Sequence, residues 1–292
     1  IRLYTSSLTV CAQPQYTPII SECQERLSTQ MSGIIVGGIV KNREWCVRRW
    51  LDSLYGSYKY YRDHSDNPLS ATIVIVEDHS TDFTILEITD YNRIQDGISG
   101  TVLPAVYKES GPHVSLRGYS FEHLAYLRNI LYKEFVANDA DYLFSVDSDI
   151  LIAEDCLLKL IEANKEIVAA PVRNSTNENV LNFLLRNDHY FYQTYTRNID
   201  TIAKIMPDYP RKMPTLFEVG LTGACILISR AAHTLLPERP YRADDITHVA
   251  EDVGFADACY TAGVKQWIRS DIKTIHLYDK NTKLIPVHME NA

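Results

Sequence analysis

Solid runs of apolar residues alternate with amphipathic stretches through the middle of the chain. The clearest runs are residues 33–40, 71–76 and 142–146. Each has the length of a strand and lacks the apolar–polar alternation of a strand that is exposed on one face. Stretches 44–55 and 119–137 carry apolar residues at helical spacing. This order of elements predicts an α/β fold with a parallel sheet that helices cover on both faces.

Weaker patterns predict the remaining elements. The further helices are expected over 20–28, 83–91, 155–164 and 247–262, where the last begins as a loop, and the further strands over 102–107, 166–171, 221–229, 264–268 and 273–277. Residues 173–218 are rich in Asn and Tyr and show little strand pattern. We therefore predict an N-terminal extension, residues 1–31, followed by one domain, residues 32–292.

Two carboxylates, Asp147 and Asp149, follow the apolar run 142–146 directly. Their i, i+2 spacing would place them on the same side of an extended chain. Such close like charges repel unless a cation or a proton lies between them. Oxygen ligands of this kind suit Mg²⁺ or Mn²⁺, which can carry the phosphates of a nucleotide. The alternative is a solvated turn, because Asp and Ser are ordinary turn residues.

Asp78 likewise follows a predicted buried strand, residues 71–76. Ligands of parallel α/β sheets bind at the carboxyl ends of the strands. We therefore expect Asp78, Asp147 and Asp149 to lie on the ligand-binding edge of the sheet.

Composition and charge narrow the classes of function. The chain has 292 residues, of which 46% are hydrophobic and 23% charged, and its net charge is −8. This charge argues against general nucleic-acid binding, although a bound divalent ion would still admit a nucleotide. No apolar run reaches the length that spans a bilayer. Because the chain begins with Ile, we expect a processed or truncated start, from which an anchor or targeting segment could have been lost.

The six cysteines are scattered and form no C-x-x-C motif. Those with apolar neighbours are predicted to be buried thiols: Cys46, Cys156, Cys225 and Cys259. Cys11 and Cys23 flank a Pro-containing loop and could pair. This usage slightly favours a reducing compartment, and hence the cytoplasm. Location in the lumen of the secretory pathway, or at a membrane, is the alternative if an anchor was removed.

Four separated motifs, in this order, resemble those of glycosyltransferases of the GT-A fold, and of family 2 in particular. Glu77-Asp78-His79-Ser80-Thr81-Asp82 is similar to the D-D-x-S-x-D segment after the second strand, and Asp147-Ser148-Asp149 is similar to the DxD motif. Ala250-Glu251-Asp252 is similar to the xED motif, and Thr274-Ile275-His276 is similar to the segment with the C-terminal metal-binding histidine. Residues 220–223 resemble the acceptor loop. The likeness covers about 32–278, and a weaker one extends to collagen-type galactosyl- and glucosyltransferases.

The resemblance implies a Rossmann-like, mostly parallel sheet, with a nucleotide-sugar-binding half, 32–172, and an acceptor-binding half, 173–292. It implies transfer of a hexose from a nucleotide-sugar, expected to be a UDP-sugar, to a hydroxyl of a glycan, peptide or small molecule. Mn²⁺ or Mg²⁺ would be held by Asp147, Asp149 and His276. Asp252, beside Glu251, would be the catalytic base of an inverting reaction. The donor contacts would come from Glu77, Asp78, Arg128, Asp147, Ser148 and Asp149.

Every one of these residues also has an ordinary structural interpretation. Glu251 and Asp252 would complement a helix N-terminus, Asp78 would shape a turn, Arg128 would lie on a helix surface, and His276 would be a satisfied core or surface residue. Trp267 and Tyr278 could stack on an acceptor sugar or simply pack in the core.

Three other functions stay open: a retaining transferase, a nucleotidyltransferase and a non-catalytic sugar-binding domain. The loop from Val40 to Glu44 lacks the Gly cluster expected of a nucleotidyltransferase. We also expect the Tyr-rich segment 182–217, with Tyr190, Tyr192 and Tyr195, to form the acceptor side.

Overall fold

The computed structural model describes residues 33–94, 99–104, 120–173, 181–184 and 215–279. The chain divides into a unit of residues 1–30 and a unit of residues 31–292, and every described residue belongs to the second. The predictions for the N-terminal extension, for the pair Cys11 and Cys23, and for most of the Tyr-rich segment lie outside the described residues.

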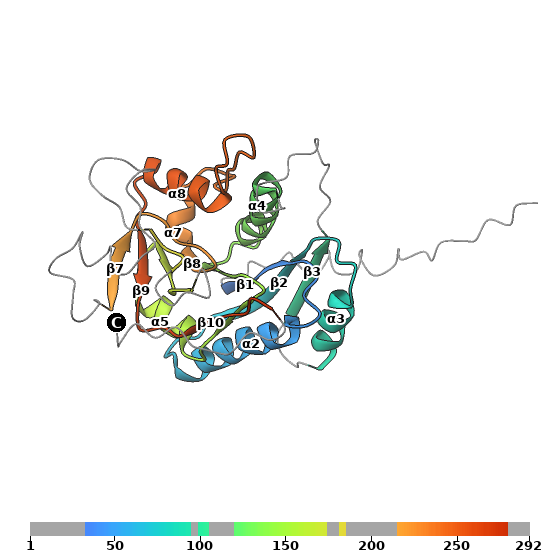
Figure 1. Ribbon diagram of the computed structural model, residues 1–292. Coiled ribbons are helices and arrows are strands. Elements are labelled where there is room, and N and C mark those ends of the chain that lie inside the picture. Colours follow the sequence, from blue (N-terminus) through green and yellow to red (C-terminus); the bar gives the residue numbers. More distant parts are fainter. Residues whose placement is uncertain (1–32, 95–98, 105–119, 174–180, 185–214, 280–292) are drawn as a thin grey trace, which may run out of the picture. The chain divides into compact units, whose positions relative to one another are not determined.

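Among the described residues, eight strands form one sheet in the order β3-β2-β1-β4-β8-β6-β9-β7 (Figure 1). The strands are β1 (Gly33–Val40), β2 (Ser70–Glu77), β3 (Ser99–Pro104), β4 (Tyr142–Val146), β6 (Ile167–Ala169), β7 (Leu216–Val219), β8 (Cys225–Ser229) and β9 (Gln266–Arg269). Strands β3, β2, β1 and β4 pair in parallel, as do β6 and β9. Strands β8 and β7 run antiparallel to their neighbours. The predicted α/β class with a mostly parallel sheet is confirmed, and β8 and β7 are its antiparallel members.

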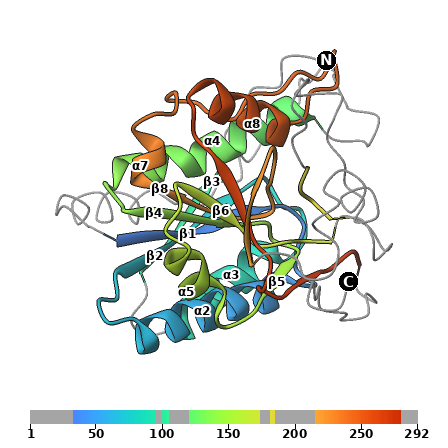
Figure 2. The same cartoon turned by 90° about the vertical axis from the view of Figure 1, so that its left-hand side faces the viewer.

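Helices cover both faces of this sheet, as Figures 1 and 2 show. One layer consists of α2 (Val47–His64), α3 (Thr84–Ile94) and α5 (Cys156–Glu162), and the other of α4 (Phe121–Ala137), α7 (Arg230–His233) and α8 (Glu251–Thr261). Successive side chains of a strand point to opposite faces, so β1 supplies both layers. Ile34 packs in the cluster that contains Trp50 of α2, and Ile35 in the cluster that contains Leu131 of α4. No helix in the described part of the chain is long and apolar enough to cross a membrane.

A small second sheet pairs β5 (Ile150–Ile152) antiparallel with β10 (Thr274–His276). His276 lies opposite Ile150, and the amide of Leu277 donates to the carbonyl oxygen of Asp149 over 2.7 Å. This pairing brings the C-terminal histidine next to the Asp147–Asp149 segment. The sequence did not predict β5, because three residues are too few to show a period.

Element boundaries differ from the prediction in several places. Helix α2 continues to His64, past the predicted end at residue 55, because the helix accommodates Gly56. Strand β3 spans 99–104 rather than 102–107, and β8 starts at Cys225 rather than at residue 221. Strand β7 begins at the end of the segment 173–218, which shows little strand pattern. Its four residues alternate in burial, as expected for a short strand at the edge of a sheet.

Strand β1 approaches the end of β4 closely at Gly38. A β-carbon on Gly38 would lie 2.1 Å from the carbonyl oxygen of Val146, the residue before Asp147. We expect Gly38→Ala to lower the free energy of unfolding by about 1–3 kcal/mol, because backbone of a neighbouring strand would have to move. Gly56 is the matched control, because the nearest atom to its added β-carbon is 4.0 Å away. Gly56→Ala should stabilise by about 0.5–1 kcal/mol.

Urea denaturation of both variants measures the difference. Similar free energies of unfolding for the two alanine variants would contradict a close approach of β1 and β4.

Candidate active site

The central sheet reverses its strand order between β1 and β4. The chain runs from β1 outward to β2 and β3, and then returns to place β4 on the other side of β1. Ligands of open α/β sheets bind at the carboxyl ends of the strands beside such a reversal. The loops that leave β1 and β4 there begin with Lys41 and Asp147. The fold therefore places the Asp147–Asp149 segment at the expected ligand-binding position.

Arg128 of α4 joins the end of β4 to the start of α8. Its Nη1 lies 3.0 Å from Oδ1 of Asp147, its Nη2 donates to Oδ2 over 3.2 Å, and its Nε lies 3.3 Å from Oε1 of Glu251. Burial disfavours the charge of Arg128, but Asp147 and Glu251 still raise its pKa well above the ordinary value. Burial also raises the pKa of Glu251, against the opposing effect of Arg128. Two predicted site acids are thus bridged by one largely buried arginine side chain.

The carboxylate of Asp149 lies near different side chains from those that contact Asp147. Its Oδ2 lies 3.0 Å from Nη2 of Arg43, and its Oδ1 lies 3.8 Å from Nε2 of His276. Burial, with a further contribution from Asp147, raises the pKa of Asp149. The segment is not extended, because the amide of Ile150 donates to the carbonyl oxygen of Asp147 over 2.9 Å and closes a turn. The expectation that both carboxylates share one side of an extended chain is therefore corrected.

His276 is oriented by a backbone carbonyl. Its Nδ1 lies 2.6 Å from the carbonyl oxygen of Arg173, which can only accept. In the neutral ring the proton is therefore on Nδ1, and the lone pair of Nε2 faces Asp149. Two ligands that are each about 2.1 Å from a cation lie at most about 4.2 Å apart. The 3.8 Å between Asp149 and His276 fits a shared divalent ion.

Asp147 does not join this pair. Both of its carboxylate oxygens are engaged by Arg128. Within the described residues, no three His, Cys, Asp or Glu side chains are grouped so that they could hold a metal ion. The chain thus offers two candidate ligands, Asp149 and His276, and the metal role of Asp147 remains a prediction.

Asp78 is buried at the end of β2, between two basic side chains. Its Oδ2 accepts from Nζ of Lys41 over 3.0 Å, and its Oδ1 lies 2.9 Å from Nε2 of His123. Glu77 is used within its own turn, where its carboxylate accepts from the amides of His79 and Ser80. Asp78 is therefore held firmly beside the reversal point, while Glu77 has the turn-shaping role that was the structural alternative for Asp78.

Asp252 lies beside the loop that connects β7 with β8. A β-carbon built on Gly223 of this loop would be 3.8 Å from Cβ of Asp252. The next residue, Ala224, accepts a hydrogen bond from the amide of Asp147 over 2.7 Å. Asp252 also accepts from the amide of Val253 over 2.8 Å, as an acid in the first turn of a helix often does. The loop thus brings the predicted base close to the Asp147 segment.

Ser148 is buried, and its carbonyl oxygen accepts from the thiol of Cys46. The ring of Tyr278 lies tilted beside that of His276, with centroids 4.2 Å apart, and its hydroxyl donates to the carbonyl oxygen of Arg173. Trp267 lies under Lys165, whose Nζ is 4.4 Å from the ring centroid. Any stacking of Trp267 or Tyr278 on an acceptor remains a prediction.

The four cysteines predicted to be buried are buried free thiols.

Three residues of this site were not predicted: Lys41, Arg43 and His123. Lys41 and Arg43 stand directly after a solid apolar run, as do the acids that were predicted. Their position at the carboxyl end of β1 was the available signal. His123 offered none, because it lies in the first turn of a helix whose packing depends on the completed sheet.

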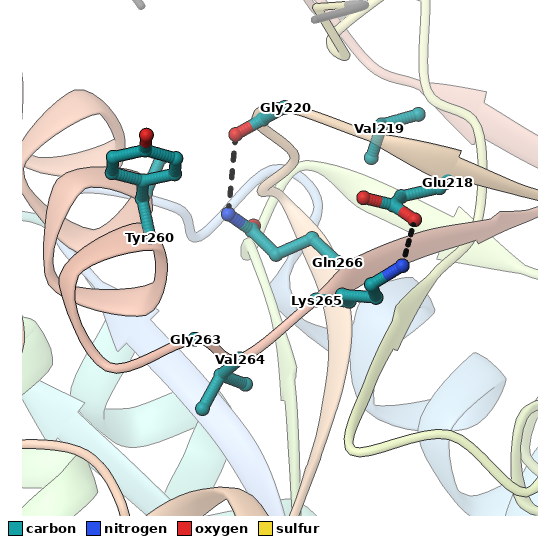
Figure 3. A pocket seen from close by; sticks show the side chains of 9 residues that line it. Glu218, Val219, Gly220, Tyr260, Gly263, Val264, Lys265 and Gln266 are labelled. Atoms are coloured by element: carbon teal, nitrogen blue, oxygen red, sulfur yellow. Dashed lines mark hydrogen bonds and ion pairs between the residues drawn. The ribbon is translucent and has the colours of Figure 1, made fainter.

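A shallow pocket of about 190 Å³ lies elsewhere, between α8 and the ends of β7 and β9 (Figure 3). Lys265 and Glu218 pair across its rim at 2.7 Å, and Gln266 donates to the carbonyl oxygen of Gly220. Gly220, the first residue of the predicted acceptor loop, lines it, but none of the predicted catalytic, donor-binding or metal-binding residues does. The pocket is therefore separate from the cluster of acids and arginines.

Comparison with known proteins finds no matching family model and no matching curated protein. Among solved structures, a mannosyltransferase from Pyrobaculum calidifontis in complex with GDP-Man and Mn²⁺ is 13% identical with a TM-score of 0.49, over 83% of this chain and 56% of that one. S. aureus TarS 1-349 in complex with UDP is 16% identical with a TM-score of 0.47, over 82% and 58%. A197 from STIV is 13% identical with a TM-score of 0.47, over 85% and 87%.

The chain therefore spans little more than half the length of the first two structures. A likeness of this degree does not by itself assign an activity or a substrate.

Proposed function

We propose that this chain is a divalent-metal-dependent glycosyltransferase that moves a hexose from a nucleotide-sugar, expected to be a UDP-sugar, to an acceptor hydroxyl with inversion. One observation carries the proposal. Arg128 bridges Asp147 and Glu251, which lie 19 and 123 residues from it in sequence, at the reversal point of the sheet. His276 lies 3.8 Å from Asp149 in the same region. Motifs that are far apart in the sequence thus lie close together, which supports a common site.

The donor side would be formed by Asp78, Asp149 and His276. Lys41 and His123 hold the carboxylate of Asp78, which supports a fixed contact to the nucleobase. Asp149 and His276 would hold the metal, and the donor diphosphate and water would fill its remaining positions. When bound, this ion would act as a Lewis acid on the departing phosphate.

The acceptor side would include Asp252 as general base. Its position beside Gly223 supports this role. The next residue in that loop, Ala224, accepts a hydrogen bond from the amide of Asp147, so only this loop lies between Asp252 and the Asp147 segment. A base must lie within hydrogen-bond reach of the acceptor hydroxyl. The segment 182–217, most of which lies outside the described residues, is proposed to complete this side.

Release of the nucleoside diphosphate from UDP-, GDP- and dTDP-sugars tests the proposal. We expect slow hydrolysis of one donor class in the presence of Mn²⁺, and its loss in EDTA or in Asp149→Asn. Asp155→Asn is the control, because Asp155 pairs with Lys159 on α5 and has no place in the site.

Each other outcome points to a different function. Full turnover in EDTA would contradict the metal role. Binding of a nucleotide-sugar without any turnover would favour a non-catalytic sugar-binding domain. Formation of a nucleotide-sugar and pyrophosphate from a nucleoside triphosphate and a sugar phosphate would indicate a nucleotidyltransferase.

A further inference from the structure

Arg43 lies at the reversal point of the sheet, in a loop with a fixed backbone. Its amide donates to Oγ1 of Thr84 over 2.7 Å, and its carbonyl oxygen accepts from the amides of Cys46 and Val47 over 2.9 and 2.7 Å. These bonds tie the loop to the start of α2 and to α3. The side chain therefore projects from a rigid support toward Asp149.

The guanidinium of Arg43 is only partly used. Its Nη2 donates to Oδ2 of Asp149 over 3.0 Å. Its Nε is buried and has no hydrogen-bond partner in the part of the chain that the structure describes. A buried donor without a partner is costly, and more so on a charged group. The donor Nε and the adjacent Nη form the planar fork that matches two oxygens of a phosphate.

Arg43 also forms an ion pair with Asp149, whose carboxylate would bind the metal. Oδ2 of Asp149 faces Arg43, while Oδ1 faces Nε2 of His276. Arg43 thus neutralises Asp149 in the absence of a divalent ion. Binding of an ion between Asp149 and His276 would weaken this pair and leave a guanidinium beside the ion.

We propose that Arg43 binds the diphosphate of the donor, and that Asp149 exchanges the guanidinium of Arg43 for the metal when the donor enters. This inference rests on the proposed function and adds a residue to it. Arg43 would contact phosphate oxygens through Nε and Nη2, so that the leaving group is neutralised from two sides. In the donor-free protein Arg43 would compete with divalent ions for Asp149.

Calorimetric titration of the full chain with UDP, GDP, uridine and guanosine at saturating Mn²⁺ tests the first part. Arg43→Gln should weaken binding of the preferred nucleoside diphosphate by about 10–100-fold, the range of charge-assisted hydrogen bonds to phosphate. Binding of the corresponding nucleoside should not change. Arg48→Gln is the matched control, because it removes an Arg–carboxylate pair with Glu87 at the exposed surface of α2.

Titration with Mn²⁺ alone tests the second part. Arg43→Gln should bind Mn²⁺ several-fold more tightly than the wild type, because Asp149 no longer has a competing cation. Unchanged or weaker Mn²⁺ binding would overturn the exchange at Asp149. This measurement needs no substrate and no activity.

The outcomes separate the two proposals. A wild type that binds none of the four nucleosides and nucleotides would overturn both the proposed function and the role of Arg43. A wild type that binds UDP or GDP, with equal affinity in Arg43→Gln, would overturn the role of Arg43 alone. Equal losses for nucleoside and diphosphate would reduce Arg43 to a structural residue. If Arg43→Gln does not fold, Arg43→Lys replaces it, and wild-type affinity in that variant would overturn the role of the guanidinium fork.

Discussion

Replacing Arg128 by Met is expected to lower the free energy of unfolding by about 3–5 kcal/mol, the cost of removing one member of a buried charge cluster. The side chain of Arg128 is 13% exposed, that of Glu251 is 10% exposed and that of Asp147 is 31% exposed. Without Arg128, Glu251 and Asp147 would face each other as uncompensated carboxylates. Met retains most of the length of the side chain, so packing against the ring of Tyr241 should change little.

The loss should depend on pH in a defined direction. Burial raises the folded-state pKa of Glu251, and removal of Arg128 should raise it further. A carboxyl with a raised folded-state pKa binds more protons when folded than when unfolded, so it lowers stability as pH rises through that window. The deficit of Arg128→Met should therefore be largest at neutral pH and shrink as the solution is acidified.

Urea denaturation at several pH values measures this effect. Arg48→Met is the control, because the Arg48–Glu87 pair is exposed and such pairs contribute about 0–1 kcal/mol. Equal losses in Arg48→Met and Arg128→Met, or a loss that grows on acidification, would contradict a buried bridge between Asp147 and Glu251.

The strands and helices with the strongest periodicity could be predicted from the sequence. The apolar runs of β1, β2 and β4 and the long pattern of α4 specify their element type without tertiary context. The direction of β8 could not be predicted, because a strand buried on both faces shows the same apolar run whether it pairs in parallel or antiparallel. Short elements such as β5 and β7 are formed by pairing with β10 and β9 rather than by their own pattern.

The acids of the candidate site could be predicted because they follow recognisable strands. Their partners could not. Arg43 lies 106 residues from Asp149, and His123 lies 45 residues from Asp78. Which basic group meets which acid depends on the order of the strands in the sheet. The turn closed by Ile150 and Asp147 has the same origin, because β5 begins only where β10 is present to pair with it.

Asp252→Asn is expected to lower kcat by at least about 100-fold, the effect of losing a general base, while the affinity for the donor changes little. Asn is the most selective replacement, because it changes the basicity of the side chain and little else. Its amide oxygen can still accept from the amide of Val253, as Oδ1 of Asp252 does over 2.8 Å, so α8 should keep its first turn. The variant removes the basicity of the side chain and leaves its shape beside Gly223.

Steady-state turnover with the preferred nucleotide-sugar, together with calorimetric binding of the nucleoside diphosphate, measures the two quantities separately. Asp257→Asn is the matched control, because it removes one carboxylate from the same helix, more than one turn beyond Asp252. Near-normal kcat in Asp252→Asn would leave Asp252 as an acid that only complements the start of α8. A loss of kcat in Glu251→Gln but not in Asp252→Asn would transfer the role of base to Glu251. In that case burial, which raises the pKa of Glu251, would outweigh the ion pair with Arg128, which favours the charged carboxylate.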